Sequence, residues 1–346
     1  MIRVRRALAF DDVLLAPKLN KVTSRSKVEK HKFGFGGVSL DLPIVAANMD
    51  TVCGGNMAKA MHKNGGLGII HRAQSILLQV NSLKRVEEFI YSENPNETAL
   101  IGAAVGIGDE GFERAKECIK AGANVICIDV AHGYDPRVKG LLGNLLADSD
   151  VMIIAGNIAT VNAADYLWEV VVKVGGEGRV LLKAGVGGGS MCTTRIRTGC
   201  GLPTLQSVFE IADAGYPVIA DGGIRNSGDI VKCFAVGAHA VMVGSLLAGT
   251  DEAPGTPVNG FKPYRGSASG EAKKDFYGKE EYVEGVATNI ACKGPVTDVL
   301  QYLADGMRSG VSYCGVTKLE ELHGSVDFVE VTYAGVLESR PHGVTP

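Results

Sequence analysis

The stretch PVIADGGIRNSGDIVKCFAVGAHAVMVGS, residues 217–245, decides the fold. It starts with an apolar run (217–223), continues with an amphipathic pattern (227–238) and ends in a second apolar run (240–245). Both apolar runs are nearly continuous, which is typical of strands covered on both faces of a parallel sheet. The stretch therefore predicts one strand–helix–strand unit of an α/β protein.

Similar apolar runs occur before this unit, at 43–49, 66–71, 100–106, 124–131, 151–157 and 180–185. Amphipathic patterns such as 111–123 and 161–174 predict helices between them. Eight strands with intervening helices in about 200 residues match a (β/α)8 TIM barrel. A doubly wound sheet is the alternative, but no Gly-x-Gly-x-x-Gly motif follows the first strand. We expect one barrel domain over residues 1–346.

The composition restricts the kinds of molecule that the protein is expected to bind. Lys and Arg total 35 against 38 Asp and Glu, a net charge of −3, which weighs against nucleic acid or an anionic membrane. No apolar run reaches the ~18 residues of a membrane-spanning helix. The eight cysteines include no Cys-x-x-Cys pair, which argues against a zinc site and a disulfide framework. We therefore expect reduced thiols and a cytoplasmic protein.

Polar or glycine residues follow nearly every predicted strand. Because the carboxyl ends of barrel strands share one rim, these residues should converge into one site. Segment 251–295 differs, being rich in Gly, Lys, Glu and Tyr with little periodicity, and is expected to form a mobile flap over that site. After it, 296–310 predicts a helix and 326–336 reads as a strand.

The strongest local signal is GVGGGSMCTTR, residues 185–195. A glycine-rich loop exposes backbone N–H groups and allows a ligand to approach closely. On such a loop, beside N–H dipoles and Arg195, the thiol of Cys192 can act as a nucleophile. The alternative is a flexible turn with an incidental cysteine.

Two later strand ends, ADGGI (220–224) and VMVGS (241–245), match the usual phosphate site of phosphate-binding barrels. Asp221 would accept hydrogen bonds from a ribose diol, and ordinary turns are the alternative. Asp129 and His132 fit either an acid–base pair or a helix cap.

Taken together, seven motifs resemble the IMP dehydrogenase / GMP reductase family: FDDVLLAP (10–17), ANMDTV (47–52), DVAHGY (129–134), AGN (155–157), GSMCTTR (189–195), ADGGI (220–224) and VMVGSLLAG (241–249). The resemblance covers nearly the whole chain and implies a TIM barrel that assembles as a homotetramer. Many dehydrogenases of the family carry inserted CBS modules. Here residues 66–75 run directly into a predicted helix, so no insert is expected.

The resemblance also implies residue roles. Cys192 would attack C2 of a purine nucleotide (GMP or IMP) and form a thioimidate. The substrate would be bound by Ser190, Asp221, Gly222, Gly223, Gly244, Ser245, Tyr264, Gly266, Ser267, Glu284 and Gly285. A nicotinamide cofactor would contact Ser24, Arg25, Asp129, Val130 and Ala131. Carbonyl groups of Gly187, Gly189 and Cys192 would hold a monovalent cation, K⁺.

Two reactions occur within the family. A GMP reductase converts GMP to IMP and ammonia with NADPH, whereas an IMP dehydrogenase converts IMP to XMP with NAD⁺ and water. The dehydrogenase activates water with an Arg-Tyr pair on a long flap, and residues 266–295 contain Asp275-Phe276-Tyr277 but no such pair. Segments 24–29 and 312–322 also resemble the reductase, which we therefore favour.

Some positions depart from the reductase pattern. Gly270 stands where the reductase has a glutamate, so Glu271, one residue later, is expected to work with Thr194 in catalysis. Gly188 replaces the family's proline, which predicts a looser loop, and 335–344 is more similar to the dehydrogenase's cation-binding tail. A dehydrogenase that activates water through Tyr277, Glu280 or Glu281, and a weakly active nucleotide-binding protein, therefore stay open as alternatives.

Overall fold

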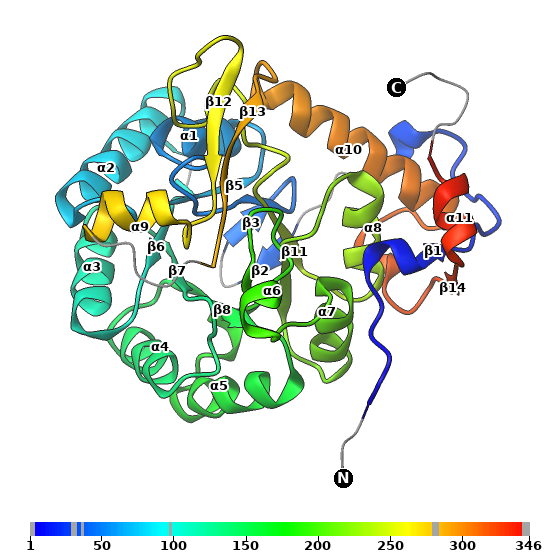
Figure 1. Cartoon of the computed structure of the whole chain (residues 1–346), viewed down its shortest axis with the longest axis horizontal. Helices are drawn as coiled ribbons and strands as arrows, with labels where there is room; N and C mark the ends of the chain where they lie inside the picture. The colour runs from blue at the N-terminus through cyan, green and yellow to red at the C-terminus, as the bar shows by residue number, and fades with distance from the viewer. Residues whose placement is uncertain (1–3, 29–32, 36–37, 97–98, 279–283, 341–346) are drawn as a thin grey trace.

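The computed structural model describes residues 4–28, 33–35, 38–96, 99–278 and 284–340. Eight parallel strands close into a barrel in chain order, with β10 and β11 completing the ring back to β4 (Figure 1). The strands are β4 (Ile44–Ala46), β5 (Leu67–Ile70), β6 (Gly102–Val105), β7 (Val125–Asp129), β8 (Met152–Ile158), β9 (Val180–Ala184), β10 (Val218–Asp221) and β11 (Ala240–Val243). Seven of them lie within predicted runs and β8 extends one residue beyond its run, so the TIM barrel is confirmed and the doubly wound sheet is excluded.

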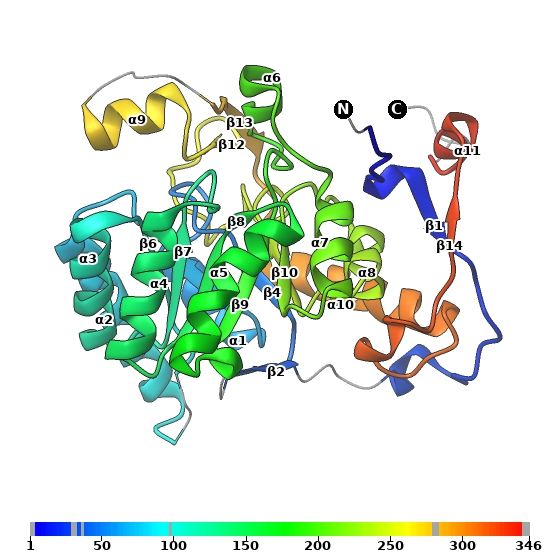
Figure 2. The same cartoon turned by 90° about the horizontal axis from the view of Figure 1, so that it is seen from below.

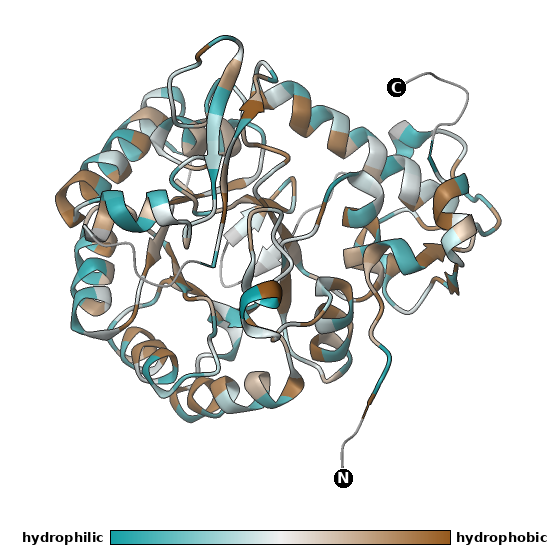
Figure 3. Cartoon of the chain, in the orientation of Figure 1, coloured by the Kyte–Doolittle hydropathy of each residue, from teal (hydrophilic) through white to brown (hydrophobic). Residues whose placement is uncertain are grey.

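An outer ring of helices follows the strands in turn: α1 (Gly55–Lys63), α2 (Ile76–Glu93), α3 (Gly108–Lys120), α4 (Pro136–Asp148), α5 (Val161–Val174), α7 (Thr204–Asp213), α8 (Ser227–Ala235) and α10 (Val296–Tyr313). Local sequence explains their ends. The side chain of Thr160 accepts a hydrogen bond from Ala163 N at the start of α5, and Gly175 ends α5 with φ +69°. Figure 3 shows both hydrophilic and hydrophobic residues along these helices, as expected for elements with one buried face.

Two apolar layers explain why the strands are almost continuously hydrophobic. One set of strand side chains, including Leu181 and Ile219, fills the barrel interior. The alternate set, including Leu182 and Val218, packs between the barrel and the helices. Both faces of each strand are therefore buried, and full burial of one such side chain is worth about 1.5–3 kcal/mol.

The predicted flap, 251–295, contains more regular structure than its sequence pattern indicates. β12 (Phe261–Arg265) and β13 (Ala287–Ala291) pair antiparallel, and α9 (Gly270–Tyr277) follows β12. Figure 2 shows the hairpin, α9 and the short α6 (Thr194–Thr198) on the same side of the barrel. These elements lie at the end of the barrel toward which its strands run, and they cover the expected site.

The remaining elements are not part of the ring of parallel strands and helices. β1 (Val13–Leu15) pairs antiparallel with β14 (Phe328–Glu330), and β2 (Phe33–Phe35) pairs with β3 (Val38–Leu40). The strand expected at 326–336 is wrong beyond residue 330, because Thr332 caps the helix α11 (Tyr333–Glu338) by accepting from Gly335 N. Four short 3₁₀ helices complete the described chain: η1 (Phe10–Asp12), η2 (Arg25–Lys27), η3 (Glu177–Arg179) and η4 (Glu320–Leu322).

Only residues 71–75 connect β5 to α2, so the barrel carries no CBS insert there, as expected. Within the described residues, every helix is too short or too polar to cross a bilayer.

Candidate active site

A cavity of ≈ 440 Å³ lies at the carboxyl ends of the barrel strands. It brings together side chains and loops that are widely separated in the sequence, as expected for a barrel rim. Its walls include every residue predicted to bind substrate, together with Cys192, Thr194, Asp129, Val130, Ala131, Gly187 and Gly189. Three predicted residues, Ser24, Arg25 and Glu271, do not line it.

Cys192 lies at the start of a short chain of hydrogen bonds. Its Sγ donates to Thr194 Oγ1 at 3.1 Å, and Thr194 Oγ1 donates to Glu284 Oε2 at 2.8 Å. The backbone holds the same partners together, since Thr193 N donates to the carbonyl of Glu284 at 2.9 Å. A thiol, a hydroxyl and a carboxylate in this order can take up, pass on and hold a proton.

Glu271 is not the partner of Thr194, contrary to the expectation. Ser269 caps α9 by accepting from Ala272 N, which places Glu271 in the first helical turn with its side chain 71% exposed. Its carboxylate lies 4.0 Å from Arg265 Nη1, on the wall of a different cavity. Glu284, a residue expected to bind substrate, occupies the position beside Thr194 instead.

The glycine-rich loop is closely packed rather than loose. A Cβ on Gly185 would lie 1.8 Å from the carbonyl oxygen of Asp221, and a Cβ on Gly222 would lie 2.9 Å from Gly189 N. At Gly188 an added Cβ would lie 2.3 Å from the buried Thr204 Oγ1. The hydroxyl of Thr204 therefore fills the space that the family's proline ring would need, which accounts for Gly188.

The part of the site expected to bind phosphate contains a hydroxyl pair. Ser190 Oγ and Tyr264 Oη are 2.9 Å apart, and Tyr264 is 5% exposed. Burial raises the pKa of Tyr264, although hydrogen bonds with Ser190 and Ser245 partly oppose this effect. The phenol therefore stays protonated at neutral pH and is available as a hydrogen-bond donor to an anion.

Beneath the cavity lies a lysine that the sequence analysis missed. Lys183, 1% exposed at the end of β9, forms ion pairs with Asp129 and with Asp221 (2.9 Å), and it also donates to Asn157. Burial alone would lower the pKa of Lys183, but attraction to the two carboxylates outweighs burial and raises it. A lysine inside the apolar run VLLKAG was the available signal, because a buried charge requires a partner.

Asp129 is therefore held in place by an ion pair and a hydrogen bond, and it is not a free acid–base group. Burial would raise its pKa, but attraction to Lys183 lowers it below the usual range, and Asn48 Nδ2 donates to its other oxygen at 3.0 Å. His132 instead packs against the ring of Tyr134. The arrangement favours a fixed, ionised Asp129 over the proposed pair with His132.

Ser24 and Arg25 lie away from the cavity of their own protomer, and their expected contact with the cofactor stays a prediction. Arg25 packs over the ring of Tyr313, 5.9 Å from its centroid, at the end of α10. The segment that includes Ser24 and η2 runs alongside α10 and does not reach the strand ends. Asp129, Val130 and Ala131 are thus the predicted cofactor residues that the cavity contains.

The predicted cation loop offers oxygen ligands but only part of a coordination shell. The expected ligands are three carbonyl groups, and that of Gly189 already accepts a hydrogen bond from Cys192 N at 3.0 Å. Hard cations take six or more oxygen ligands, so a bound ion requires further ligands from elsewhere. Among the described residues, His, Cys, Asp and Glu side chains form no cluster of three that could hold a metal.

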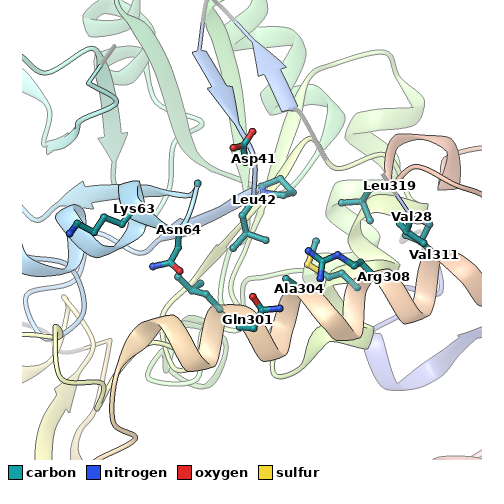
Figure 4. Close-up of a pocket in the computed structure, with 14 residues that line it drawn as sticks. Val28, Asp41, Leu42, Lys63, Asn64, Gln301, Ala304, Arg308, Val311 and Leu319 are labelled. Atoms are coloured by element: carbon teal, nitrogen blue, oxygen red, sulfur yellow. The ribbon is translucent and has the colours of Figure 1, made fainter. Parts of the chain in front are cut away.

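A separate cavity of ≈ 250 Å³ lies between the β3–β4 connection, the end of α1 and α10 (Figure 4). Its lining includes Asp41, Lys63, Asn64, Gln301 and Arg308, with apolar side chains of α10 between them. It contains none of the residues that the motifs predict for the site.

Comparisons with known proteins agree with the barrel fold. The model of the IMP dehydrogenase / GMP reductase domain matches residues 7–342. An inosine-5′-monophosphate dehydrogenase of Nitrosopumilus maritimus is 33% identical over 98% of this chain and 99% of that protein. The corresponding enzyme of Cryptosporidium parvum is 34% identical, over 99% and 96%. A crystal structure of a GMP reductase from Trypanosoma brucei with guanosine 5′-monophosphate superposes with a TM-score of 0.89 at 30% identity, covering 99% of each chain. The chain belongs to the IMP dehydrogenase / GMP reductase family.

Proposed function

We propose that this protein is a GMP reductase, which converts GMP to IMP and ammonia as NADPH is oxidised to NADP⁺. The observation that carries the proposal is the hydrogen-bonded chain from Cys192 through Thr194 to Glu284. It lies on the cavity wall between the glycine-rich loop and the segment that follows α9.

The proton balance of the first step fits this chain. The Sγ atom of Cys192 bonds to C2 of the purine, and the bond from C2 to the amino group breaks. The thiol loses one proton and the departing amine must gain one to leave as ammonia. Thr194 lies between the thiol and Glu284, so the proton can pass through its hydroxyl while the carboxylate of Glu284 holds it.

The residues present also fit a nicotinamide cofactor, which supplies the hydride to C2 when bound. The cavity extends past Cys192 to Asn48, Arg72 and the wall formed by Asp129 and Ala131. Arg72 adds a cationic group suited to the phosphates of a dinucleotide. Once C2 carries that hydride, the bond from C2 to Sγ would break, and the Cys192 thiolate would take up a proton to return to the thiol.

The alternative is an IMP dehydrogenase with an atypical flap, in which Thr194 and Glu284 would take a proton from water. The sequence relatives named above favour it, because they carry that name. Against it stands the absence of an Arg-Tyr pair between 266 and 295, where Asp275 and Phe276 contact Arg265. Glu280 and Glu281 lie outside the described residues, as does the side chain of Tyr277.

Further expectations accompany the proposal. Residues 251–295 would act as a flap within a single domain, Gly187, Gly189 and Cys192 would contribute to a potassium site, and four copies would form a homotetramer. NADPH is preferred over NADH or NAD⁺ on the strength of the reductase assignment alone.

A paired absorbance assay at 340 nm tests the reaction: GMP with NADPH in one cuvette, and IMP with NAD⁺ in the other. A decrease in absorbance with GMP alone supports the reductase. An increase with IMP alone assigns the dehydrogenase, and no change in either with tight purine nucleotide binding assigns the weakly active binding protein. Cys192→Ala is the matched control, since it removes the nucleophile and leaves the phosphate contacts in place.

A further inference from the structure

Arg265 lies at a junction between the barrel and α9. It ends β12, and its neighbours Tyr264 and Gly266 both line the cavity. Its guanidinium donates through Nε to Asp50 Oδ2 at 2.8 Å, and Nη2 lies 2.7 Å from the same oxygen. Asp50 is 8% exposed and follows β4, so Arg265 is fixed to the barrel on this side.

On its other side Arg265 holds the helix. Nη1 donates to Asp275 Oδ2 at 2.7 Å, and the guanidinium lies over the ring of Phe276, 5.6 Å from the centroid. The first turn of α9 is held separately, by the buried cap residue Ser269. The described part of α9 is therefore attached at both of its ends.

This attachment sets the rotation of α9. Glu271 and Asp275 are four positions apart and share one helical face, which is directed to Arg265. Lys273 is two positions from each, about 200° around a helix of 3.6 residues per turn, so its side chain extends from the other face. That face borders the main cavity, and Lys273 lines it.

The same cavity is therefore lined by two cationic side chains, Lys273 and Arg72. Arg72 lies beside Gly106 at the end of β6, and α9 lies over the β6 and α3 side of the barrel (Figure 1). The Ser190–Tyr264 pair marks the part of the site where the nucleoside 5′-phosphate is expected. A dinucleotide brings further phosphate groups, for which a lysine ammonium is a suitable partner.

We propose that Lys273 binds a phosphate group of the nicotinamide dinucleotide, and that Arg265 is a positioning residue which holds Lys273 there through Asp275 and Phe276. The inference rests on the proposed function for the identity of the ligand. The anchoring of α9 by Arg265 does not depend on it.

The test uses the full-length protein and the variants Asp275→Asn, Lys273→Met and the double variant. Asp298→Asn on α10 is the matched control, because it removes one exposed carboxylate at a distance from Arg265. Hydrogen exchange of the α9 amides should accelerate in Asp275→Asn and stay unchanged in Asp298→Asn. Unchanged exchange in Asp275→Asn would overturn the anchoring role.

Binding of NADPH, followed by its fluorescence, gives the second measurement. Asp275→Asn and Lys273→Met should each weaken it about two- to fivefold, the range expected for an exposed ion pair, with no change in GMP binding. The double variant should be no weaker than Lys273→Met, since Asp275 acts through Lys273. Unaltered NADPH affinity in Lys273→Met, or additive losses in the double variant, would overturn the phosphate-binding role.

If the protein is not a GMP reductase, the exchange and binding measurements give a different set of results. Wild-type protein that binds no dinucleotide refutes the reductase and the role of Lys273 together, while accelerated exchange in Asp275→Asn still supports the anchoring. Dinucleotide binding with altered affinity in Lys273→Met, but without turnover of either purine nucleotide, supports the inference and refutes the reductase.

Discussion

Replacement of Lys183 by methionine should strongly destabilise the barrel at neutral pH. Methionine preserves most of the side-chain volume but removes the ammonium group that faces Asp129 and Asp221. The two carboxylates then share a partly buried space without a cation. Asn48 and Asn157 still donate to them, but neutral amides do not cancel a negative charge.

The size of the effect follows from the exposure of the partners. Loss of one member of a fully buried ion pair costs about 3–5 kcal/mol. The side chains of Asp129 and Asp221 are 23% and 19% exposed, because both face the cavity. Some solvation is therefore retained, and we expect a decrease of about 2–4 kcal/mol in the free energy of unfolding.

The pH dependence identifies the cause. In the wild type, Lys183 lowers the pKa of Asp129, so this contribution to stability is complete above about pH 4 and is lost as the pH falls further. Without Lys183, burial raises the pKa of Asp129 above its unfolded value. The penalty is then largest at pH 7 and decreases as the pH falls, because protonation of the carboxylate relieves it.

Urea denaturation of wild type and variant at pH 5, 6, 7 and 8 measures this difference. The matched control is Lys262→Met, since Lys262 is also buried but donates only to the carbonyl oxygens of Thr250, Asp251 and Ala253. Its loss of stability should be independent of pH over this range. A Lys183→Met deficit that is equally independent of pH, or below about 1 kcal/mol at pH 7, would refute the electrostatic reasoning.

Three other outcomes test the site. Thr194→Val and Glu284→Gln should each lower kcat about 10²–10³-fold with little change in KM, and a Glu271→Gln enzyme that loses as much would contradict the relay through Glu284. Tyr264→Phe should raise the KM for the nucleoside monophosphate about 5- to 30-fold while leaving binding of the unphosphorylated nucleoside unchanged, as measured by calorimetry. Iodoacetamide at pH 7.5 should label the accessible thiols of Cys192, Cys200 and Cys292, and bound purine nucleotide should protect Cys192. It should not label Cys118, because burial raises the pKa of that thiol to about 12, nor the fully buried Cys53 and Cys127. Mass spectrometry of the modified peptides measures the labelling, and modification of the buried cysteines in the folded protein would contradict the prediction.

The barrel was predictable because short local sequence patterns mark each of its strands and helices. Each strand is an apolar run with a turn signal after it, and each helix carries its own end signals, so α5 begins and ends where its sequence predicts. The hairpin of β12 and β13 had no such signal. β13 (Ala287–Ala291) is largely exposed and mixed in polarity. It pairs with β12, which precedes it in the sequence and is separated from it by α9.

The nucleotide end of the site was predictable for a related reason. The carboxyl ends of the barrel strands converge on one rim. Asp221 and Gly244 stand at the ends of β10 and β11, and Ser190 lies in the glycine-rich loop after β9, so all three line the cavity. The role of Lys183 required the third dimension, because its partners come from the ends of β7 and β10. Sequence reveals only that a lysine stands in a strand that is otherwise apolar.

The partner of Thr194 shows where sequence distance misleads. Glu271 is only one residue from the position expected for the partner, but Ser269 caps α9 and so directs the side chain of Glu271 toward solvent. Glu284 follows Glu271 by thirteen residues along the chain, and the backbone bond from Thr193 N to its carbonyl brings it beside the nucleophile. The residue that completes the relay is specified by how the returning segment pairs with the cysteine loop, and not by its number of residues from the preceding motif.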